Sequence, residues 1–235
     1  MDLGDLTWTE AHAASVDAVF LPVGSTEQHG PHAPLATDTI LAEAVAQRGA
    51  TTSEHEVLIG PTIPVGIAEE HRAFAGTVWI TPDTFRTLIR EIVSALAAHG
   101  WENIVLVNGH GGNIGALDEV TARLTRDGVA TCIPFTWFAA TDLGDTAMGH
   151  GGAVETSALL AAVPDLVRVD HLEEAASGAA DRWGRWVGGV NLAVDSDEFS
   201  ESGVVGDPRD ATAAHGEELL SSGAVHLAAI VDDLV

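Results

Sequence analysis

Short apolar segments alternate with longer amphipathic segments along this chain of 235 residues, and that alternation constrains its fold more than any other feature. The apolar segments at 17–24, 56–66 and 103–108 have the length and composition of buried strands. The segments between them are long enough for crossover helices, which parallel strands need. The pattern predicts one α/β domain over residues 1–235, with a mostly parallel sheet and helices on both faces.

The segment from Thr81 to Gly100 shows most clearly how this sequence specifies a helix. Thr81 and Pro82 provide an N-cap and a proline at the first helical position. Apolar residues then recur at spacings of three and four, which places them on one face of a helix that ends at Gly100. The same reasoning predicts further strands at 74–80 and 129–135, further helices at 39–49, at 114–128 and near 153–163, and a C-terminal helix opened by Asp207-Pro208.

Residues 171–205 interrupt this alternation. The segment is acidic and rich in glycine, and it contains Trp183 and Trp186. Long loops without regular structure are uncommon in compact domains unless they have a role. We therefore interpret 171–205 as a long functional loop or as a segment that contacts another subunit.

The charge balance excludes one class of partner. Acidic residues number 35 and basic residues 10, all of them arginine, so the formal net charge is −25. A field of this sign repels the phosphate backbone of nucleic acids. The acidic residues are spread along the chain rather than gathered in a tail, which predicts a halophilic protein whose self-repulsion is screened by a salty cytosol.

The composition also predicts where the protein works. No apolar run reaches the roughly 20 residues that a membrane-spanning helix requires. The N-terminus is acidic and lacks the basic and then apolar order of a signal peptide. The single cysteine, Cys132, cannot form an internal disulfide, which agrees with a reducing compartment. We therefore expect a cytoplasmic protein with no membrane partner.

Polar residues are densest in GSTEQHGPHAPLATD at 24–38, directly after the first predicted strand. Loops at the carboxyl ends of parallel strands form the ligand sites of open α/β sheets. Side chains two residues apart in an extended chain point the same way, so Glu27 and His29 can approach one cation together. Asp38 can supply a carboxylate that bridges two ions. The alternative is that these residues, with His32, only form turns.

Two further glycine-rich turns contain candidate ligands. NGHGGN at 108–113 follows a predicted strand, so His110 can approach the first loop from a neighbouring strand. GHGGAVETS at 149–157 follows a strand region, opens a helix and contributes His150 and Glu155, although a glutamate there can also simply complement the helix dipole. Three such turns at one sheet edge favour a metal site over three unrelated surface turns.

Other candidate residues lack clustered partners. His71, in EEHRAFAGT, can contact a substrate or be a surface residue, and Trp137 can wall a pocket or pack in the core. Cys132 lies in an apolar segment without the basic surroundings of a reactive thiolate. The sequence has no Walker loop, no Rossmann glycine fingerprint and no Gly-x-Ser-x-Gly elbow, which argues against the enzyme classes built on these motifs.

In order and spacing, these motifs resemble the creatininase family of metallohydrolases. The segments that carry the resemblance cover most of the chain: GSTEQHGPHAPLATDT, EEHRAFAGT, VNGHGGN, GHGGAVETS and GVVGDPRDATAAHGE. The resemblance implies one α/β domain, two divalent metal ions (zinc, manganese or iron) per subunit, and a homo-oligomer that is commonly a hexamer. By position, the residues that match metal ligands are Glu27, His29, Asp38 and His110. The resemblance makes Asp38 the bridging ligand and gives His150 a role in proton transfer.

The chain departs from creatininase itself at Gly111 and Gly112, where that enzyme has a tyrosine and a metal-binding glutamate. Because Gly112 cannot bind a metal, we predict that Glu155 completes the ligands of the second ion. The Gly-Gly form is similar to branches that trim the mycofactocin precursor peptide or deformylate a formamidopyrimidine nucleotide. The segments at 69–77 and 203–208 favour the peptidase branch.

We therefore predict a metal-dependent amidohydrolase in which two divalent ions activate water for attack on an amide carbon. The expected substrate is a small molecule or a short peptide, contacted by His71, Gly111, Gly112 and Trp137. Creatinine hydrolysis and formamide hydrolysis are alternatives within the family. An alternative from another class is a non-catalytic assembly protein with a closed structural metal site, whereas a serine or cysteine amidase has no nucleophile motif in this sequence.

Overall fold

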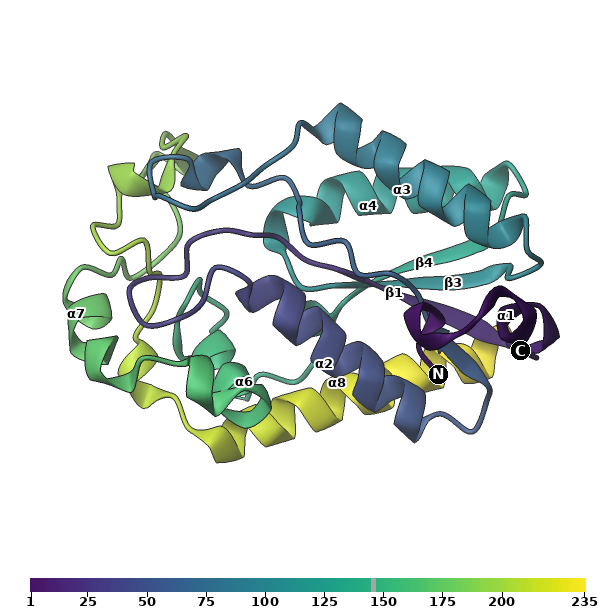
Figure 1. The fold of residues 1–235 in the computed structure, drawn as a ribbon. Helices are drawn as coiled ribbons and strands as arrows, with labels where there is room; N and C mark the ends of the chain where they lie inside the picture. Colours follow the sequence, from purple (N-terminus) through teal and green to yellow (C-terminus); the bar gives the residue numbers. More distant parts are fainter. Residues whose placement is uncertain (145–146) are drawn as a thin grey trace.

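A four-stranded parallel sheet runs through the centre of the computed structural model, which describes residues 1–144 and 147–235 (Figure 1). Its strands are β1 (Ala18–Val23), β2 (Val57–Ile59), β3 (Asn103–Asn108) and β4 (Thr131–Thr136). Their order is β2-β1-β3-β4, and each neighbouring pair is parallel. The predicted parallel sheet is confirmed.

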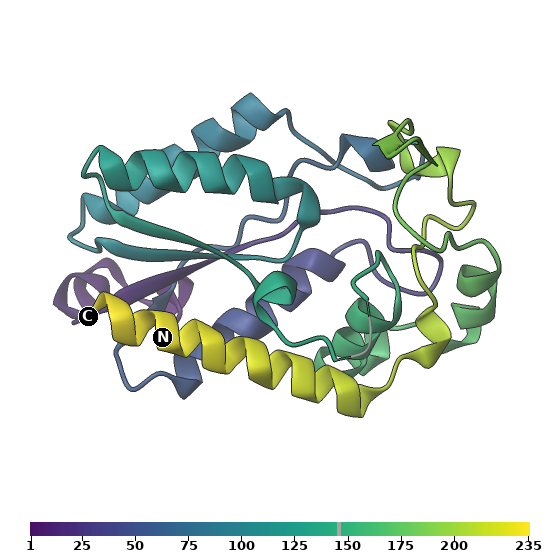
Figure 2. The same ribbon diagram turned by 180° about the vertical axis from the view of Figure 1, so that it is seen from behind.

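Helices cover both faces of the sheet, as predicted (Figure 1, Figure 2). One face is covered by α3 (Pro82–Ala97) and α4 (Ile114–Arg126), and the other by α2 (Thr37–Thr52), α6 (Ala153–Ala162) and α8 (Ala213–Leu234). Side chains alternate along each strand, so Phe20 and Val105 join the core beneath α2 and α8. Leu21 and Leu106 join the core beneath α3 and α4. Because both faces are covered, all six residues of β1 are buried.

Helix α3 follows its predicted pattern from cap to end. Thr81 Oγ1 accepts a hydrogen bond from Thr84 N at 3.3 Å, and Pro82 begins the helix. Gly100 ends the following turn with a φ of +88°, which glycine adopts without strain. The buried stripe of the helix consists of Phe85, Ile89, Val93 and Leu96.

Three predicted elements differ in the structure. Residues 74–80 form a loop rather than a strand, because the chain bends at Gly76 (φ +94°) before Val78 makes an isolated bridge to Thr26. Helix α8 begins at Ala213 after its N-cap Thr212, whereas Pro208–Asp210 is a separate 3-10 turn. The turn GHGGAVETS does not directly follow a strand, since α5 (Trp137–Ala140) comes between β4 and that turn.

The segment at 171–205 is more ordered than the loop we predicted. It contains α7 (Leu172–Ser177) and a hairpin of β5 (Trp186–Val187) and β6 (Val190–Asn191). Gly188 and Gly189 both have a positive φ, which allows the tight turn between these short strands. Part of the segment is therefore regular, and its role as a functional loop or as a contact with another subunit stays a prediction.

The two ends of the molecule differ in what they contain. Helix α1 (Trp8–Ala13) lies near both chain termini, whereas the loops that follow β1 extend toward the opposite end, where α7 lies (Figure 1). The polar turns of the sequence lie toward this second end. None of the helices among the described residues is long and apolar enough to cross a membrane.

Candidate metal centre

The carboxyl ends of β1 and β3 bring the first two polar turns together. These strands are neighbours, with Val23 opposite Asn108, so the chain after each strand leaves at the same edge. Gly109 N donates to Val23 O at 2.9 Å, and a Cβ at Gly109 would overlap the main-chain oxygen of Asp38. Glycine at this position therefore lets the end of β3 approach the first turn of α2.

Three of the candidate ligands meet in one buried group. His110 Nδ1 lies 3.1 Å from Glu27 Oε2 and 3.1 Å from Asp38 Oδ2. The other ring nitrogen, Nε2, donates to Ile67 O at 2.7 Å and so orients Nδ1 toward the carboxylates. The ligand atoms of Glu27, Asp38 and His110 are close enough together to hold one metal ion.

A second group lies on the other side of Asp38. His29 Nε2 is 3.0 Å from Asp38 Oδ1 and 3.8 Å from Glu155 Oε1. The other oxygen of Glu155 accepts from Gly151 N at 2.6 Å, which fixes this carboxylate at the start of α6. The two oxygens of Asp38 thus face two different histidines, the arrangement expected of a carboxylate that bridges two ions.

The site contains unpaired polar atoms that a cation would satisfy. Both carboxylate oxygens of Glu27, Asp38 Oδ2 and His29 Nε2 are buried and have no hydrogen-bond partner among the described residues. Buried polar groups of folded proteins are normally hydrogen-bonded, and buried charges are paired or bind metals. Carboxylate oxygens and imidazole nitrogens are ligands of zinc, manganese and iron. The residues present therefore fit divalent cations.

Burial and charge act against each other at these imidazoles. Burial disfavours the charged form of His29, but Asp38 and Glu155 outweigh it and raise the pKa of His29 well above its usual value. Glu27 and Asp38 outweigh burial in the same way and raise the pKa of His110. Burial alone would raise the pKa of Asp38, but the two histidines lower it. A metal ion that binds here must therefore displace protons.

Three histidine rings stack beside this centre. The His150 ring lies between those of His29 and His71, with centroid distances of 4.2 and 4.4 Å. The backbone of His150 is held by Val205, whose carbonyl oxygen accepts from His150 N at 3.0 Å. Burial lowers the pKa of both His71 and His150, which favours the neutral form of both rings.

The stacked rings open onto a cavity of about 350 Å³. His71, His150, Gly111 and Gly112 all line it. Trp137, which we expected at the pocket, is instead fully buried in the core beneath α2 and α8. The chain turns into α5 at this residue, and it is the next side chain, Phe138, that lines the cavity.

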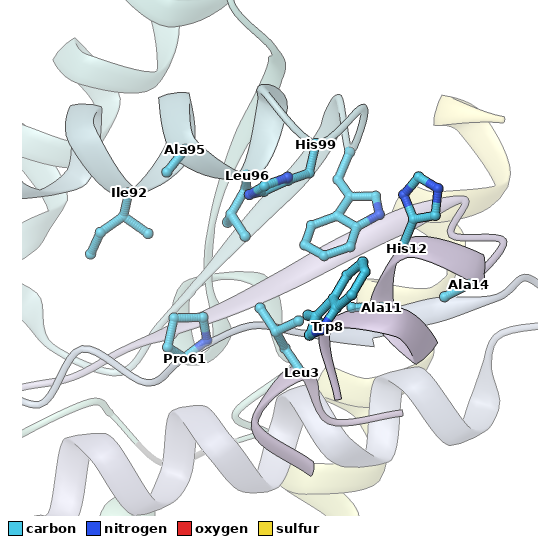
Figure 3. A pocket seen from close by; sticks show the side chains of 11 residues that line it. Leu3, Trp8, Ala11, His12, Ala14, Pro61, Ile92, Ala95, Leu96 and His99 are labelled. Carbon is cyan, nitrogen blue, oxygen red and sulfur yellow. The ribbon is translucent and has the colours of Figure 1, made fainter. Parts of the chain in front are cut away.

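A larger cavity, of about 560 Å³, lies at the end of the molecule that holds α1 (Figure 3). Its lining is mainly apolar, with Trp8 and Leu96, and its polar side chains include His12 and His99. None of the described residues that line it has a carboxylate. Size alone would make this cavity the candidate functional site. The side chains that could bind a metal line the smaller cavity instead, so we take the smaller one as the candidate site.

The two glycines after His110 differ in the space around them. A Cβ at Gly112 would overlap Ile67 O and approach His110 Nε2, which are the two partners of the bond that orients His110. A Cβ at Gly111 would have no atom of the described residues within 4 Å. A glutamate at 112 is therefore not tolerated in this backbone, whereas Glu155 already lies beside His29.

Two other residues of the polar turns have structural contacts. His32 Nε2 lies 2.9 Å from Thr156 Oγ1 and so joins the first turn to α6. Asn113 precedes α4, but its side chain does not cap that helix among the described residues. It accepts from Ile67 N at 3.0 Å and donates to Gly24 O at 3.1 Å, and thereby ties the neighbouring loops together.

Six described residues of the site were not predicted from the sequence: Gln28, Glu70, Phe138, Met148, Gly149 and Trp183. The position of Gln28 between two candidate ligands was the signal that could have identified it. Glu70 precedes His71 and lines the cavity, where burial raises its pKa. Trp183 comes from the 171–205 segment, with its ring centroid 5.5 Å from that of His71, and no sequence pattern connects the two.

The chain matches known proteins along most of its length. A family model described as Creatininase: Creatinine amidohydrolase matches residues 4–231. A mycofactocin precursor peptide peptidase of Mycolicibacterium smegmatis is 37% identical over 230 residues, which cover 93% of this chain and 85% of that protein. A creatinine amidohydrolase of Pseudomonas putida is 31% identical over 196 residues, which cover 72% of this chain and 75% of that protein.

Solved structures share the fold. A solved structure described as Creatininase Mn aligns with this chain with a TM-score of 0.81 and 26% sequence identity. The alignment covers 99% of this chain and 97% of the creatininase chain. A mutant creatininase of Zn-Zn type has a TM-score of 0.78 at 26% identity, with the same two shares covered.

Proposed function

This chain belongs to the creatininase family, and on that basis we propose that it is a two-metal amidohydrolase that cleaves an amide bond of a short peptide. Its family and relatives make it a metal-binding hydrolase of C–N amide bonds. The main support for two metal ions is the position of Asp38, whose two carboxylate oxygens face His29 and His110.

The proposed ligands divide into two sets that share Asp38. Glu27 and His110 would hold one cation together with Asp38, and His29 and Glu155 would hold the other together with Asp38. When bound, a pair of divalent cations activates a water molecule and polarises an amide carbonyl. The related structures with Mn and of Zn-Zn type support manganese or zinc as the native ion.

His150 is the residue that moves the proton in this proposal. Its Nε2 donates to Gln28 O at 2.6 Å, and its Nδ1 lies 3.8 Å from Glu27 Oε1. The neutral ring therefore offers the Nδ1 lone pair on the side of the metal ligands. Nδ1 can accept a proton from the attacking water and return it to the departing amide nitrogen.

The lining of the cavity favours a peptide over a nucleotide. Among the described residues that line it, none is an arginine, and four are acidic. A phosphate-bearing substrate, such as a formamidopyrimidine nucleotide, normally meets arginine or lysine. The rings of Phe138 and Trp183 suit an apolar side chain of a peptide. The peptidase among the relatives supports this choice.

The same cavity argues against the non-catalytic alternative. A structural metal site is closed by protein ligands, whereas a catalytic site keeps an open position. Glu27, Asp38, His110 and Glu155 all line the cavity, so a cation held by them would have an open face.

Two further properties complete the proposal, both carried over from the sequence and the family resemblance. The protein is a homo-oligomer, commonly a hexamer in this family, and it works in the cytoplasm. Light scattering after size-exclusion chromatography measures the first property, and a monomer would contradict it.

Hydrolysis by the metal-loaded protein tests the proposed function. The protein with zinc or manganese is incubated separately with a mycofactocin-type precursor peptide, creatinine and a formamidopyrimidine nucleotide, and mass spectrometry identifies the products. We expect cleavage of the peptide at one amide bond. His110→Ala removes activity and metal together, whereas His226→Ala, at an exposed position on α8, changes neither. A metal-free and fully active His110→Ala variant, or cleavage of creatinine alone, would refute the proposal.

A further inference from the structure

The amide of Gln28 is buried beneath the histidine stack, and its orientation is defined by the backbone. Gly30 N donates to Gln28 Oε1 at 2.9 Å, and Gln28 Nε2 donates to Gly203 O at 3.0 Å. Because a backbone N–H only donates and a carbonyl oxygen only accepts, these two bonds determine which end of the amide is oxygen and which is nitrogen. A Cβ at Gly203 would overlap the amide, so glycine there permits the contact.

The amide nitrogen has one further hydrogen, and two imidazole nitrogens lie within reach of it. His71 Nδ1 is 2.8 Å away and His150 Nε2 is 3.0 Å away. His150 Nε2 must carry its own hydrogen, because it lies 2.6 Å from the carbonyl oxygen of Gln28. The second amide hydrogen therefore goes to His71 Nδ1. Ser196 Oγ can donate to this same nitrogen or to Glu70 O, and neither choice changes the assignment.

A neutral His71 ring that accepts at Nδ1 carries its single hydrogen on Nε2. That nitrogen faces the metal ligands, 3.5 Å from Glu27 Oε1. His150 has the opposite arrangement, because its unprotonated Nδ1 lies 3.8 Å from the same oxygen. The two stacked rings thus present one hydrogen-bond donor and one acceptor beside the same carboxylate. Although Glu27, His71 and His150 lie close enough for a third ion, a protonated Nε2 cannot bind one.

We propose that Gln28 is a positioning residue that holds His71 as the Nε2–H tautomer, and that this N–H donates to the carbonyl oxygen of the substrate amide. The inference rests on the proposed function, since it takes the substrate to be an amide. A donor that is already oriented toward a carbonyl stabilises the negative charge that develops on its oxygen during attack. His71 keeps its hydrogen throughout, and Gln28 acts only through His71.

Long-range ¹H–¹⁵N correlation spectra of ¹⁵N-histidine-labelled protein test the tautomer without any measurement of activity. The zinc-loaded protein is used, and comparison with His71→Gln identifies the signals of His71. We expect an unprotonated Nδ1 and a protonated Nε2 in the wild type. In Gln28→Glu, whose carboxylate accepts instead of donating, His71 Nδ1 becomes protonated.

Gln47→Glu is the matched control, since it makes the same chemical change at an exposed position on α2 and leaves the His71 signals unchanged. A hydrogen on His71 Nδ1 in the wild type overturns the proposal, even if Gln28→Glu does not fold. An unchanged tautomer in folded Gln28→Glu overturns the role of Gln28.

Steady-state kinetics on the cleaved peptide test the role of the donor. We expect Gln28→Glu and His71→Leu to lower kcat by about 10²–10³-fold, the loss typical of a missing oxyanion donor, with unchanged KM and zinc content. His71→Gln places an amide N–H near the position of Nε2 and restores much of the rate. Wild-type kcat in His71→Leu overturns the donor role alone. A wild type that cleaves no amide overturns the proposed function as well, while the spectra still decide the tautomer.

Discussion

Replacement of Glu155 by glutamine removes one negative charge from the metal centre with little change in shape. Glu155 Oε2 accepts from Gly151 N at 2.6 Å, and Oε1 lies 3.8 Å from His29 Nε2. In Glu155→Gln the amide oxygen keeps the bond from Gly151 N, so the amide nitrogen faces His29. The NH2 group of a side-chain amide only donates hydrogen bonds, and its nitrogen offers no free lone pair to a cation. The variant therefore tests whether Glu155 completes the second ligand set.

The expected loss of affinity follows from Coulomb's law. Two unit charges about 4 Å apart interact by about 4 kcal/mol at an effective dielectric constant of about 20, and the double charge of zinc makes this a lower bound. Since about 1.4 kcal/mol is a factor of ten in affinity, this corresponds to about 10³-fold. We expect the second cation to bind more weakly by at least about that factor. The first cation, held by Glu27, Asp38 and His110, is expected to bind with little change.

Metal analysis after dialysis against zinc buffers measures this effect. We expect about two zinc ions per wild-type chain and about one per chain of Glu155→Gln, with amide hydrolysis lost in parallel. Glu91→Gln, at an exposed position on α3, is the matched control, and circular dichroism checks the fold of both variants. If Glu155→Gln bound two ions with wild-type affinity, Glu155 would not be a ligand of the second ion. Glu70, which lines the same cavity, would then be the next candidate ligand.

Three further predictions concern pH, salt and the core. The folded-state pKa values of His29 and His110 lie above the unfolded value of about 6.5, so their protonation stabilises the metal-free fold fully below that pH and progressively less as the pH rises through the raised values. The Tm of the metal-free protein should fall over this range and recover with zinc; a Tm that rises without zinc would contradict this. The net charge is −25, so the acidic side chains repel one another and removal of salt should lower the Tm. A Tm that does not depend on salt would contradict the halophile hypothesis. Ile89→Ala empties a fully buried position on α3 and should cost about 2–5 kcal/mol in denaturant unfolding, whereas Val225→Ala, which is exposed on α8, should change stability by less than about 0.5 kcal/mol.

The sequence by itself determined the class of fold and the chemistry of the main polar turns. Apolar runs, N-caps and glycine stops are local signals, and they predicted the parallel sheet and α3 from its Thr81 cap to Gly100. The grouping of Glu27, His29 and Asp38 directly after a strand was also local. It could be interpreted as a metal site without knowledge of how the chain folds.

Only the tertiary structure decided how the side chains of distant segments face one another. The two oxygens of Asp38 are divided between His29 and His110 by the approach of β3 to α2, and Trp183 reaches His71 from a segment far along the chain. Trp137 is in the core and Phe138 at the cavity because of the direction in which α5 leaves β4. These outcomes depend on packing and hydrogen bonds between residues far apart in the chain. A local pattern of residue types does not encode such contacts.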